Sequence, residues 1–328
     1  MKKKISIDLH LHFDGSLSPE NVRALARTQN IALPKEDSEL RSMLTVDPDC
    51  KDLRQYLTKF AFPLSLLQNA RAIEQGMYTL CRELLDEGCI YAEIRFAPQL
   101  HLKWGLTQTD VVESAINGFI SSSLRGGLIL CCMRGADNAE LNAGTVEVAE
   151  KYLGKGVLAL DLAGNEAAYA TESFKTLFKT AKEKNIPFTI HAGEADSAKS
   201  VAAAIDMGAS RIGHGVRSYE DESVMKLLAK TKISLEMCPT SNLQTAIFKS
   251  LDEYPIKKFM DMGICVTLNS DNRSVSGTTA QKELALICNH FGFSEKDEIM
   301  LLKNSVSAAF ADISVKQKLF DLIEENYR

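Results

Sequence analysis

The chain has 328 residues, of which 45% are hydrophobic and 25% are charged, and its formal net charge at pH 7 is −5. This composition is ordinary for a folded globular protein and excludes an intrinsically disordered chain, a fibrous repeat and a small disulfide-stapled scaffold. The slightly acidic balance argues against a nucleic-acid partner, because proteins that bind nucleic acids normally carry a basic face.

Eight apolar runs rich in β-forming residues recur along the chain, and each is nearly continuous rather than alternating. This pattern is typical of strands that are buried on both faces of a parallel sheet. The runs cover residues 4–12, 90–98, 128–135, 157–164, 187–194, 211–216, 233–242 and 265–272.

Segments with helical periodicity separate these strands, and we predict helices at 107–124, 173–184, 197–207 and 221–229. Alternating strands and helices predict an α/β fold of the (β/α)8, or TIM barrel, type. A helical insertion follows strand one, with helices expected at 21–29, 53–67 and 72–87. There it could cover a site at the barrel mouth. Extra C-terminal helices are predicted at 279–289 and 297–311.

Two further features concern domains and location. The chain contains no low-complexity linker and no internal repeat, so we expect a single domain over 1–328. No apolar run approaches the ~20 residues of a membrane span, and Asp8 and His10 interrupt any signal-peptide core after the N-terminal lysines. The eight cysteines lack metal-binding spacing and are expected to be reduced, buried thiols. We therefore predict a cytoplasmic protein with no membrane partner.

Ionisable residues inside or directly after the predicted strands are the most informative feature. His10 and His12 stand two apart on strand one and therefore point to the same side. His191, His214 and Asp271 lie at the ends of strands five, six and eight. Barrel enzymes place their chemistry at these carboxyl ends, and burying such groups is costly unless they are paired. We expect the five side chains to converge at the barrel mouth.

This combination of imidazoles and a carboxylate suits Zn²⁺. A single strand histidine is more often an ordinary core residue, but its coincidence at several strand ends favours a metal site. Related barrels hold two metals bridged by a modified lysine after strand four. Here strand four ends in Asp-Leu-Ala-Gly at 161–164, so one ion per chain is predicted. His101 and His290 are expected to lie outside the cluster.

Six segments, in chain order, resemble the adenosine deaminase family of metal-dependent barrel enzymes. They are DLHLHFDGSL (8–17), DLAGNE (161–166), HAGE (191–194), RIGHG (211–215), EMCPTSN (236–242) and LNSDN (268–272). Each segment is weak alone, but the ordered set spans nearly the whole chain and is highly specific.

The resemblance implies a role for each matching residue. The implied zinc ligands are His10, His12, His191 and Asp271. Among the catalytic residues, Glu194 would protonate purine N1, and His214 with Asp271 would orient a water activated by the metal and accept its proton. The implied substrate-binding residues are His12, Asp14 for the ribose 5′-hydroxyl, Gly164 for purine N3 and Asn272 for purine N7.

One position departs from the commonest pattern of the family, in which a second aspartate holds purine N7. Here the residue is Asn272, and Arg273 stands where proline is frequent. A carboxamide can donate an N–H to N7 without first being protonated. We interpret Asn272 as a tolerated variant that leaves the substrate less sharply defined.

The implied activity is the hydrolytic deamination of adenosine and 2′-deoxyadenosine to inosine or deoxyinosine and ammonia, in purine salvage. Adenine deamination and deamination of a 5′-modified adenosine remain alternatives; AMP is disfavoured because Asp14 would repel a 5′-phosphate. A non-catalytic metal-binding barrel and hydrolysis of a lactone or phosphotriester rank lower. Glu194 alone could be a helix-start residue, Asp14 a cap and Gly164 a turn residue. The oligomeric state is left open.

Overall fold

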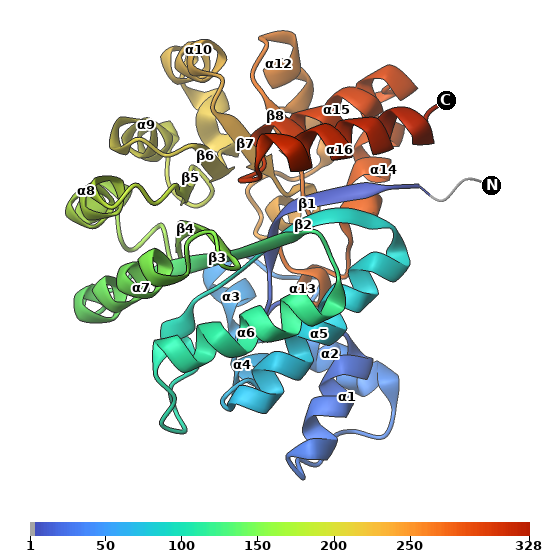
Figure 1. Ribbon diagram of the computed structural model, residues 1–328. Helices are drawn as coiled ribbons and strands as arrows, with labels where there is room; N and C mark the ends of the chain where they lie inside the picture. Colours follow the sequence, from blue (N-terminus) through green and yellow to red (C-terminus); the bar gives the residue numbers. More distant parts are fainter. Residues whose placement is uncertain (1–3) are drawn as a thin grey trace.

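A computed structural model describes residues 4–328 (Figure 1). Its eight parallel strands fall where the apolar runs predict them. They are β1 (Ser6–His12), β2 (Cys89–Phe96), β3 (Gly126–Met133), β4 (Val157–Ala163), β5 (Thr189–Ala192), β6 (Arg211–His214), β7 (Ser234–Met237) and β8 (Val266–Leu268). Parallel pairing joins the strands in chain order into two sheets. One sheet contains β1, β2, β3 and β4, and the other contains β5, β6, β7 and β8.

Backbone contacts close the two sheets into one barrel. At one seam, Asp271 N–H donates to the His10 carbonyl at 2.8 Å and His12 N–H donates to the Asp271 carbonyl at 2.7 Å. At the other, Leu160 N–H donates to the Pro187 carbonyl at 2.9 Å. The predicted (β/α)8 barrel is therefore confirmed, and the carboxyl ends of all eight strands share one mouth.

Helices surround the barrel, as Figure 1 shows. They include α6 (Gln108–Ser122), α7 (Ala139–Tyr152), α8 (Lys175–Glu183), α9 (Ala198–Met207) and α10 (Glu222–Thr231). The predicted strand at 233–242 is too long. Its last residues form α11 (Pro239–Gln244), because Pro239 at the first helical position favours a helix start. The short helix α12 (Ile256–Asp261) precedes β8.

The insertion after β1 is helical, as predicted, but the helix expected at 53–67 is divided. It forms α3 (Leu53–Leu57), a 3-10 turn η1 (Thr58–Phe60) and α4 (Ala61–Leu66). Pro63 lacks an N–H and crowds the preceding turn, which accounts for the interruption. The remaining helices are α1 (Pro19–Thr28), α2 (Asp37–Leu44), which was not predicted, and α5 (Ala70–Glu87).

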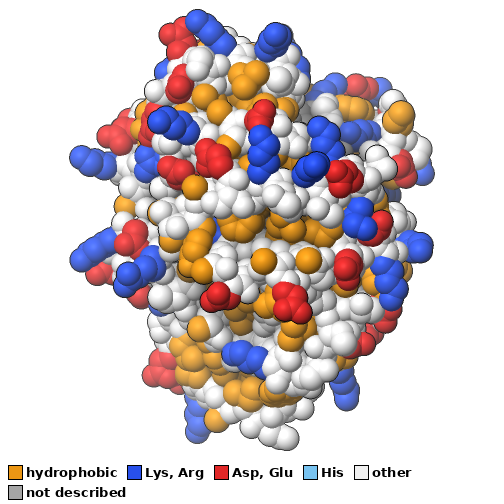
Figure 2. Space-filling view, turned by 90° about the vertical axis from the view of Figure 1, so that its left-hand side faces the viewer, with side chains coloured by type: hydrophobic (Ala, Val, Ile, Leu, Met, Phe, Trp, Pro, Cys, Tyr) orange, Lys and Arg blue, Asp and Glu red, His pale blue; other side chains and the backbone are white. Residues whose placement is uncertain are grey.

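Beyond β8 lie α13 (Arg273–Ser276), α14 (Ala280–Phe291), α15 (Glu295–Ala308) and α16 (Ile313–Asn326). The main hydrophobic core draws residues from Ile7 in β1 to Ile323 in α16. On the face shown in Figure 2, acidic and basic side chains are interspersed around a band of apolar ones. Within residues 4–328, no helix combines the length and apolar character needed to cross a membrane.

Candidate metal centre and active site

Four ionisable side chains converge at the barrel mouth. Donor atoms of His10, His191, His214 and Asp271 all lie within 4.8 Å of one another, and all four residues are buried. His12 lies beside them, with its Nε2 at 3.2 Å from Nε2 of His191 and 3.4 Å from Oδ1 of Asp271. The convergence expected for the five residues is therefore present.

The backbone is strained at two of these positions. His214 has φ of 57° and Asp271 has φ of 58°, in the left-handed region that side chains with a Cβ disfavour. At Asp271 the two seam hydrogen bonds with β1 hold this conformation in place. Such strain is frequent at functional sites, where the surrounding structure fixes a side chain in a required direction.

The cluster fits a divalent metal ion. The buried Nε2 of His10 finds no hydrogen-bond partner among residues 4–328, although it lies 3.4 Å from a carboxylate oxygen of Asp271. Burial acts to raise the pKa of Asp271, but the contact with His10 and the nearby imidazoles outweigh it and hold that pKa well below its usual range. An ionised carboxylate among imidazole nitrogens is a donor set suited to Zn²⁺ and related ions.

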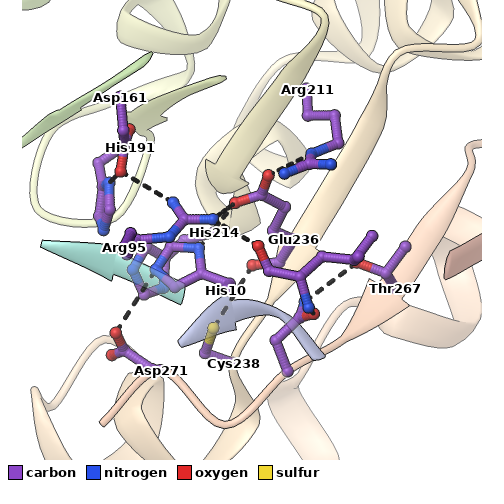
Figure 3. A network of polar contacts seen from close by, with 12 residues as sticks. His10, Arg95, Asp161, His191, Arg211, His214, Glu236, Cys238, Thr267 and Asp271 are labelled. Atoms are coloured by element: carbon purple, nitrogen blue, oxygen red, sulfur yellow. Dashed lines mark hydrogen bonds and ion pairs between the residues drawn. The ribbon is translucent and has the colours of Figure 1, made fainter. Parts of the chain in front are cut away.

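A layer of charged side chains lies beneath the cluster (Figure 3). Glu236 accepts a hydrogen bond from Nδ1 of His10 at 2.8 Å, and Asp161 lies 2.9 Å from Nδ1 of His191. Arg95 joins these carboxylates through Nη1 to Asp161 and Nη2 to Glu236, each at 2.8 Å. Carboxylates behind ligating histidines fix the ring orientation and raise the basicity of the outer nitrogen.

This layer continues away from the mouth through Arg211, which pairs with Glu236 and Glu93, each at 2.6 Å. Sequence reasoning did not assign a role to these residues. A signal was nevertheless available, because each is a charged residue inside a strand that is otherwise apolar. All are nearly or completely buried.

A cavity of about 240 Å³ opens above the cluster. It is lined by every predicted site residue except His10, which lies beneath it. The remaining lining is mostly apolar and includes Leu53, Tyr56, Leu57, Phe60 and Leu64 of the insertion. The apolar residues of the insertion thus have two different places: Phe60 lines the cavity, whereas Leu66 packs in the main core.

Glu194 lies at the cavity wall, with Oε2 at 3.6 Å from Nε2 of His214. Its loop is held by Glu166, whose carboxylate accepts backbone N–H groups from residues 193 to 196 at 2.6 to 3.1 Å. Burial, aided by the nearby carboxylates Asp271 and Glu166, raises the pKa of Glu194 well above its ordinary value. This shift favours the protonated form of the carboxyl group.

His214 has the opposite shift. Burial and the nearby His10 lower its pKa well below the ordinary value, so the ring is neutral. Its Nδ1 lies 3.1 Å from Nδ2 of Asn242, which can donate to it. Nε2 is the ring nitrogen that faces Glu194.

Asp14, Gly164 and Asn272 also line the cavity. Burial raises the pKa of Asp14 to about 6, and its Oδ1 has no hydrogen-bond partner in the described part of the chain. Gly164 has φ of 105°, which glycine adopts readily because it has no Cβ. It is therefore both a turn residue and part of the cavity wall.

The two other histidines lie outside the cluster, as expected. His101 is buried, and its Nδ1 is 2.8 Å from the Leu67 carbonyl. His290 is partly exposed, and its Nε2 lies 3.0 Å from Asp252.

Comparisons with known proteins agree with this geometry. The chain is 45% identical to the adenosine deaminase of Haemophilus ducreyi, over 98% of this chain and 96% of that protein. It is 36% identical to the adenosine deaminase of Enterococcus faecalis, with the same coverage. The crystal structure of an adenine deaminase from Arthrobacter aurescens matches 99% of both chains, with a TM-score of 0.86 and 25% identity.

A more distant structure, an N6-mAMP deaminase of Arabidopsis, shares the fold with a TM-score of 0.86 at 23% identity. The sequence profile of the family described as adenosine deaminase matches residues 6–326, which is nearly the whole described chain. Together with the convergence of the histidine and aspartate side chains at the barrel mouth, this match means that the chain belongs to the adenosine deaminase family.

Proposed function

We propose that the protein is a zinc-dependent hydrolase that converts adenosine and 2′-deoxyadenosine to inosine or deoxyinosine and ammonia, in purine salvage. The proposed ligands of a single Zn²⁺ are His10, His12, His191 and Asp271. Bound zinc would supply activation of a water molecule at neutral pH. One core shared from β1 to α16 supports a single domain, and eight free thiols are consistent with a cytoplasmic location.

Glu194 is the proposed general acid. A protonated carboxyl at the cavity wall can transfer its proton to purine N1, which withdraws electron density from the ring and makes C6 more electrophilic. The raised pKa supports this role because the group must carry a proton when the substrate arrives.

His214 is proposed to hold the attacking water in place and to accept its proton, together with Asp271. Its neutral ring supports this role, since a neutral imidazole can take up a proton. The proton then passes to the departing amino group, which leaves as ammonia.

Contacts around the rest of the ligand define the proposed substrate. Asp14 would accept a hydrogen bond from the ribose 5′-hydroxyl, and the backbone N–H of Gly164 would reach purine N3. Asn272 would donate to N7. Asp14 would repel a 5′-phosphate, which disfavours AMP. Adenine is the second candidate substrate, because the adenine deaminase of Arthrobacter aurescens shares the fold over the whole chain.

The observation that carries this proposal is the short distance from Glu194 to His214, 3.6 Å, directly beside the histidine and aspartate cluster. Hydrolysis of a lactone or phosphotriester would not require a protonated carboxyl at this place.

The test is an ultraviolet assay of adenosine, deoxyadenosine, adenine and AMP side by side. We expect the two nucleosides to be deaminated with a kcat/KM well above that of adenine or AMP. Glu194→Gln should lower kcat by about 10²- to 10⁴-fold while the metal content is unchanged. Faster turnover of adenine would identify that base as the substrate. Absence of turnover with every 6-aminopurine would contradict the proposed deaminase activity.

A further inference from the structure

The loop that carries Glu194 is bound from one side by a single carboxylate. This carboxylate belongs to Glu166, a buried residue in the loop after β4. Its Oε2 accepts hydrogen bonds from the N–H groups of residues 194, 195 and 196 at 2.9, 2.7 and 3.1 Å. Its Oε1 accepts one from Gly193 at 2.6 Å. Four successive backbone donors therefore converge on one side chain.

A chain of buried side chains holds the Glu166 carboxylate in turn. Oγ of Ser200, on α9, donates to Oε1 of Glu166 at 2.5 Å, so this oxygen is free to accept from Oγ1 of Thr171 at 2.6 Å. Thr171 accepts from Nη2 of Arg134 at 2.9 Å, and the same nitrogen donates to the His191 carbonyl at 2.6 Å. The position of Glu166 is thus tied to the end of β5.

The opposite side of the loop is held by Arg217. Its Nε donates to the Glu194 carbonyl at 2.9 Å, and its backbone N–H donates to the Gly193 carbonyl, also at 2.9 Å. The backbone N–H and the carbonyl of Glu194 are therefore both bound. From this fixed backbone the side chain reaches the cavity wall, with Oε2 at 3.6 Å from Nε2 of His214.

We propose that Glu166 is a positioning residue for the reaction: by binding the backbone of residues 193–196, it holds the carboxyl group of Glu194 where it can reach purine N1. This inference rests on the proposed function. Within the described chain, the cavity lining includes Glu194 but not Glu166, so Glu166 acts on a ligand through the loop. A displacement of about 1 Å in a reacting group can lower a rate by about 100-fold.

Glu166→Gln tests this role with almost no change in size. Both oxygens of Glu166 accept backbone N–H groups, so the NH2 group of a glutamine would face an N–H donor in either orientation and push the loop away. We expect kcat for adenosine to fall by about 10- to 100-fold, while KM changes by less than about 3-fold. Glu172→Gln makes the same chemical change at an exposed position and should match the wild type.

A binding experiment separates positioning of Glu194 from general damage to the site. Calorimetry measures dissociation constants of 7-deazaadenosine, which retains N1, and of 1-deazaadenosine, in which a C–H group replaces N1. Ultraviolet spectra verify that neither analogue is turned over during the titration. We expect Glu166→Gln to weaken binding of 7-deazaadenosine by about 10-fold, as for loss of a buried hydrogen bond, and binding of 1-deazaadenosine by less than about 2-fold.

Two further variants complete the test. Ser200→Ala removes one of the five donors to Glu166 and should give an N1-dependent loss of about 3-fold, which decides the matter if Glu166→Gln does not fold. In the Glu194→Ala background, Glu166→Gln should cause no further selective loss, because Glu166 acts through Glu194.

Equal weakening of both analogues, or weakening of neither, would overturn the proposal, since a purely structural role would not distinguish ligands by N1. These binding data do not depend on turnover. Failure of the wild-type protein to deaminate adenosine while it binds both analogues would count against the proposed function alone.

Discussion

The two sides of the cavity are built in different ways. On the metal side, the side chains come from barrel strands, and each histidine of the pair His10 and His191 is backed by a carboxylate that Arg95 holds in turn. On the purine side, α3 and α13 meet through a small apolar cluster and the neutral hydroxyls of Tyr56 and Ser276.

This difference separates chemistry from binding. Buried charges in a fixed network hold the reacting groups in one geometry, and removing one member leaves the others uncompensated. Neutral contacts between short helices are individually weaker and act mainly on how tightly a ligand is held. Changes on the metal side should therefore affect kcat, whereas changes on the purine side should affect KM.

The largest expected effect is that of removing the metal. Treatment with a chelator should abolish turnover, and added Zn²⁺ should restore it, because water activation at neutral pH depends on the ion. The measurement is kcat alongside metal content by elemental analysis. Full activity in a preparation free of transition metals would contradict the proposal that the metal side of the cavity holds a metal ion.

A second prediction concerns the charged layer behind the ligands. Glu236→Gln removes the charge that faces His10 and should weaken metal binding by about 10- to 100-fold. Metal-dependent recovery of activity in a buffered zinc series measures the change. Glu253→Gln makes the same chemical change at an exposed position and is the matched control, which should behave as wild type. An unchanged zinc dependence in Glu236→Gln would mean that the layer serves stability only.

A third prediction is a pH dependence set by Glu194. Because its pKa is raised, the protonated form persists above the ordinary range of a glutamic acid and is lost as the pH increases through the shifted value. We expect kcat/KM to fall with rising pH, by about tenfold per unit beyond that value.

The nearby Arg217 favours the ionised form of Glu194. Arg217→Gln should therefore raise the pKa of Glu194 and move the alkaline decline to higher pH. A shift toward lower pH in this variant would contradict the assignment of that decline to Glu194.

The smallest effect is expected on the purine side. Leu57 of the insertion lines the cavity, and Leu57→Ala removes apolar contact worth about 1 to 2 kcal/mol, which is about 5- to 30-fold in KM. Steady-state kinetics should show kcat nearly unchanged. Ile120→Ala, at a side chain that is 64% exposed on α6, is the control. A loss confined to kcat would contradict the expectation that changes on the purine side affect mainly KM.

The sequence predicted the barrel and the convergence of the histidines well, because buried parallel strands are continuous apolar runs and their ends carry the unusual residues. It did not predict the helices α2, α7, α12 and α16, the interruption of the helix at 53–67, or the helical start at Pro239. Those outcomes depend on local turns and on packing against the barrel rather than on periodicity.

The charged layer was also missed, although Arg95, Arg211 and Glu236 are visible as exceptions within apolar strands. Their pairing involves strands that are far apart in the chain, from β2 to β7, and periodicity says nothing about such pairs. The place of Tyr56 at the cavity is similarly hidden, since it depends on α3 meeting α13 across more than half of the sequence.

Asp271 combines two tasks at one seam of the barrel. Its backbone ties β8 to β1, while its carboxylate enters the donor cluster together with His10 from the opposite sheet. An ion held there would link the first half of the chain to the second, and the two halves could not separate without releasing the ion. Metal supply would then govern how long the folded enzyme survives as well as how fast it works.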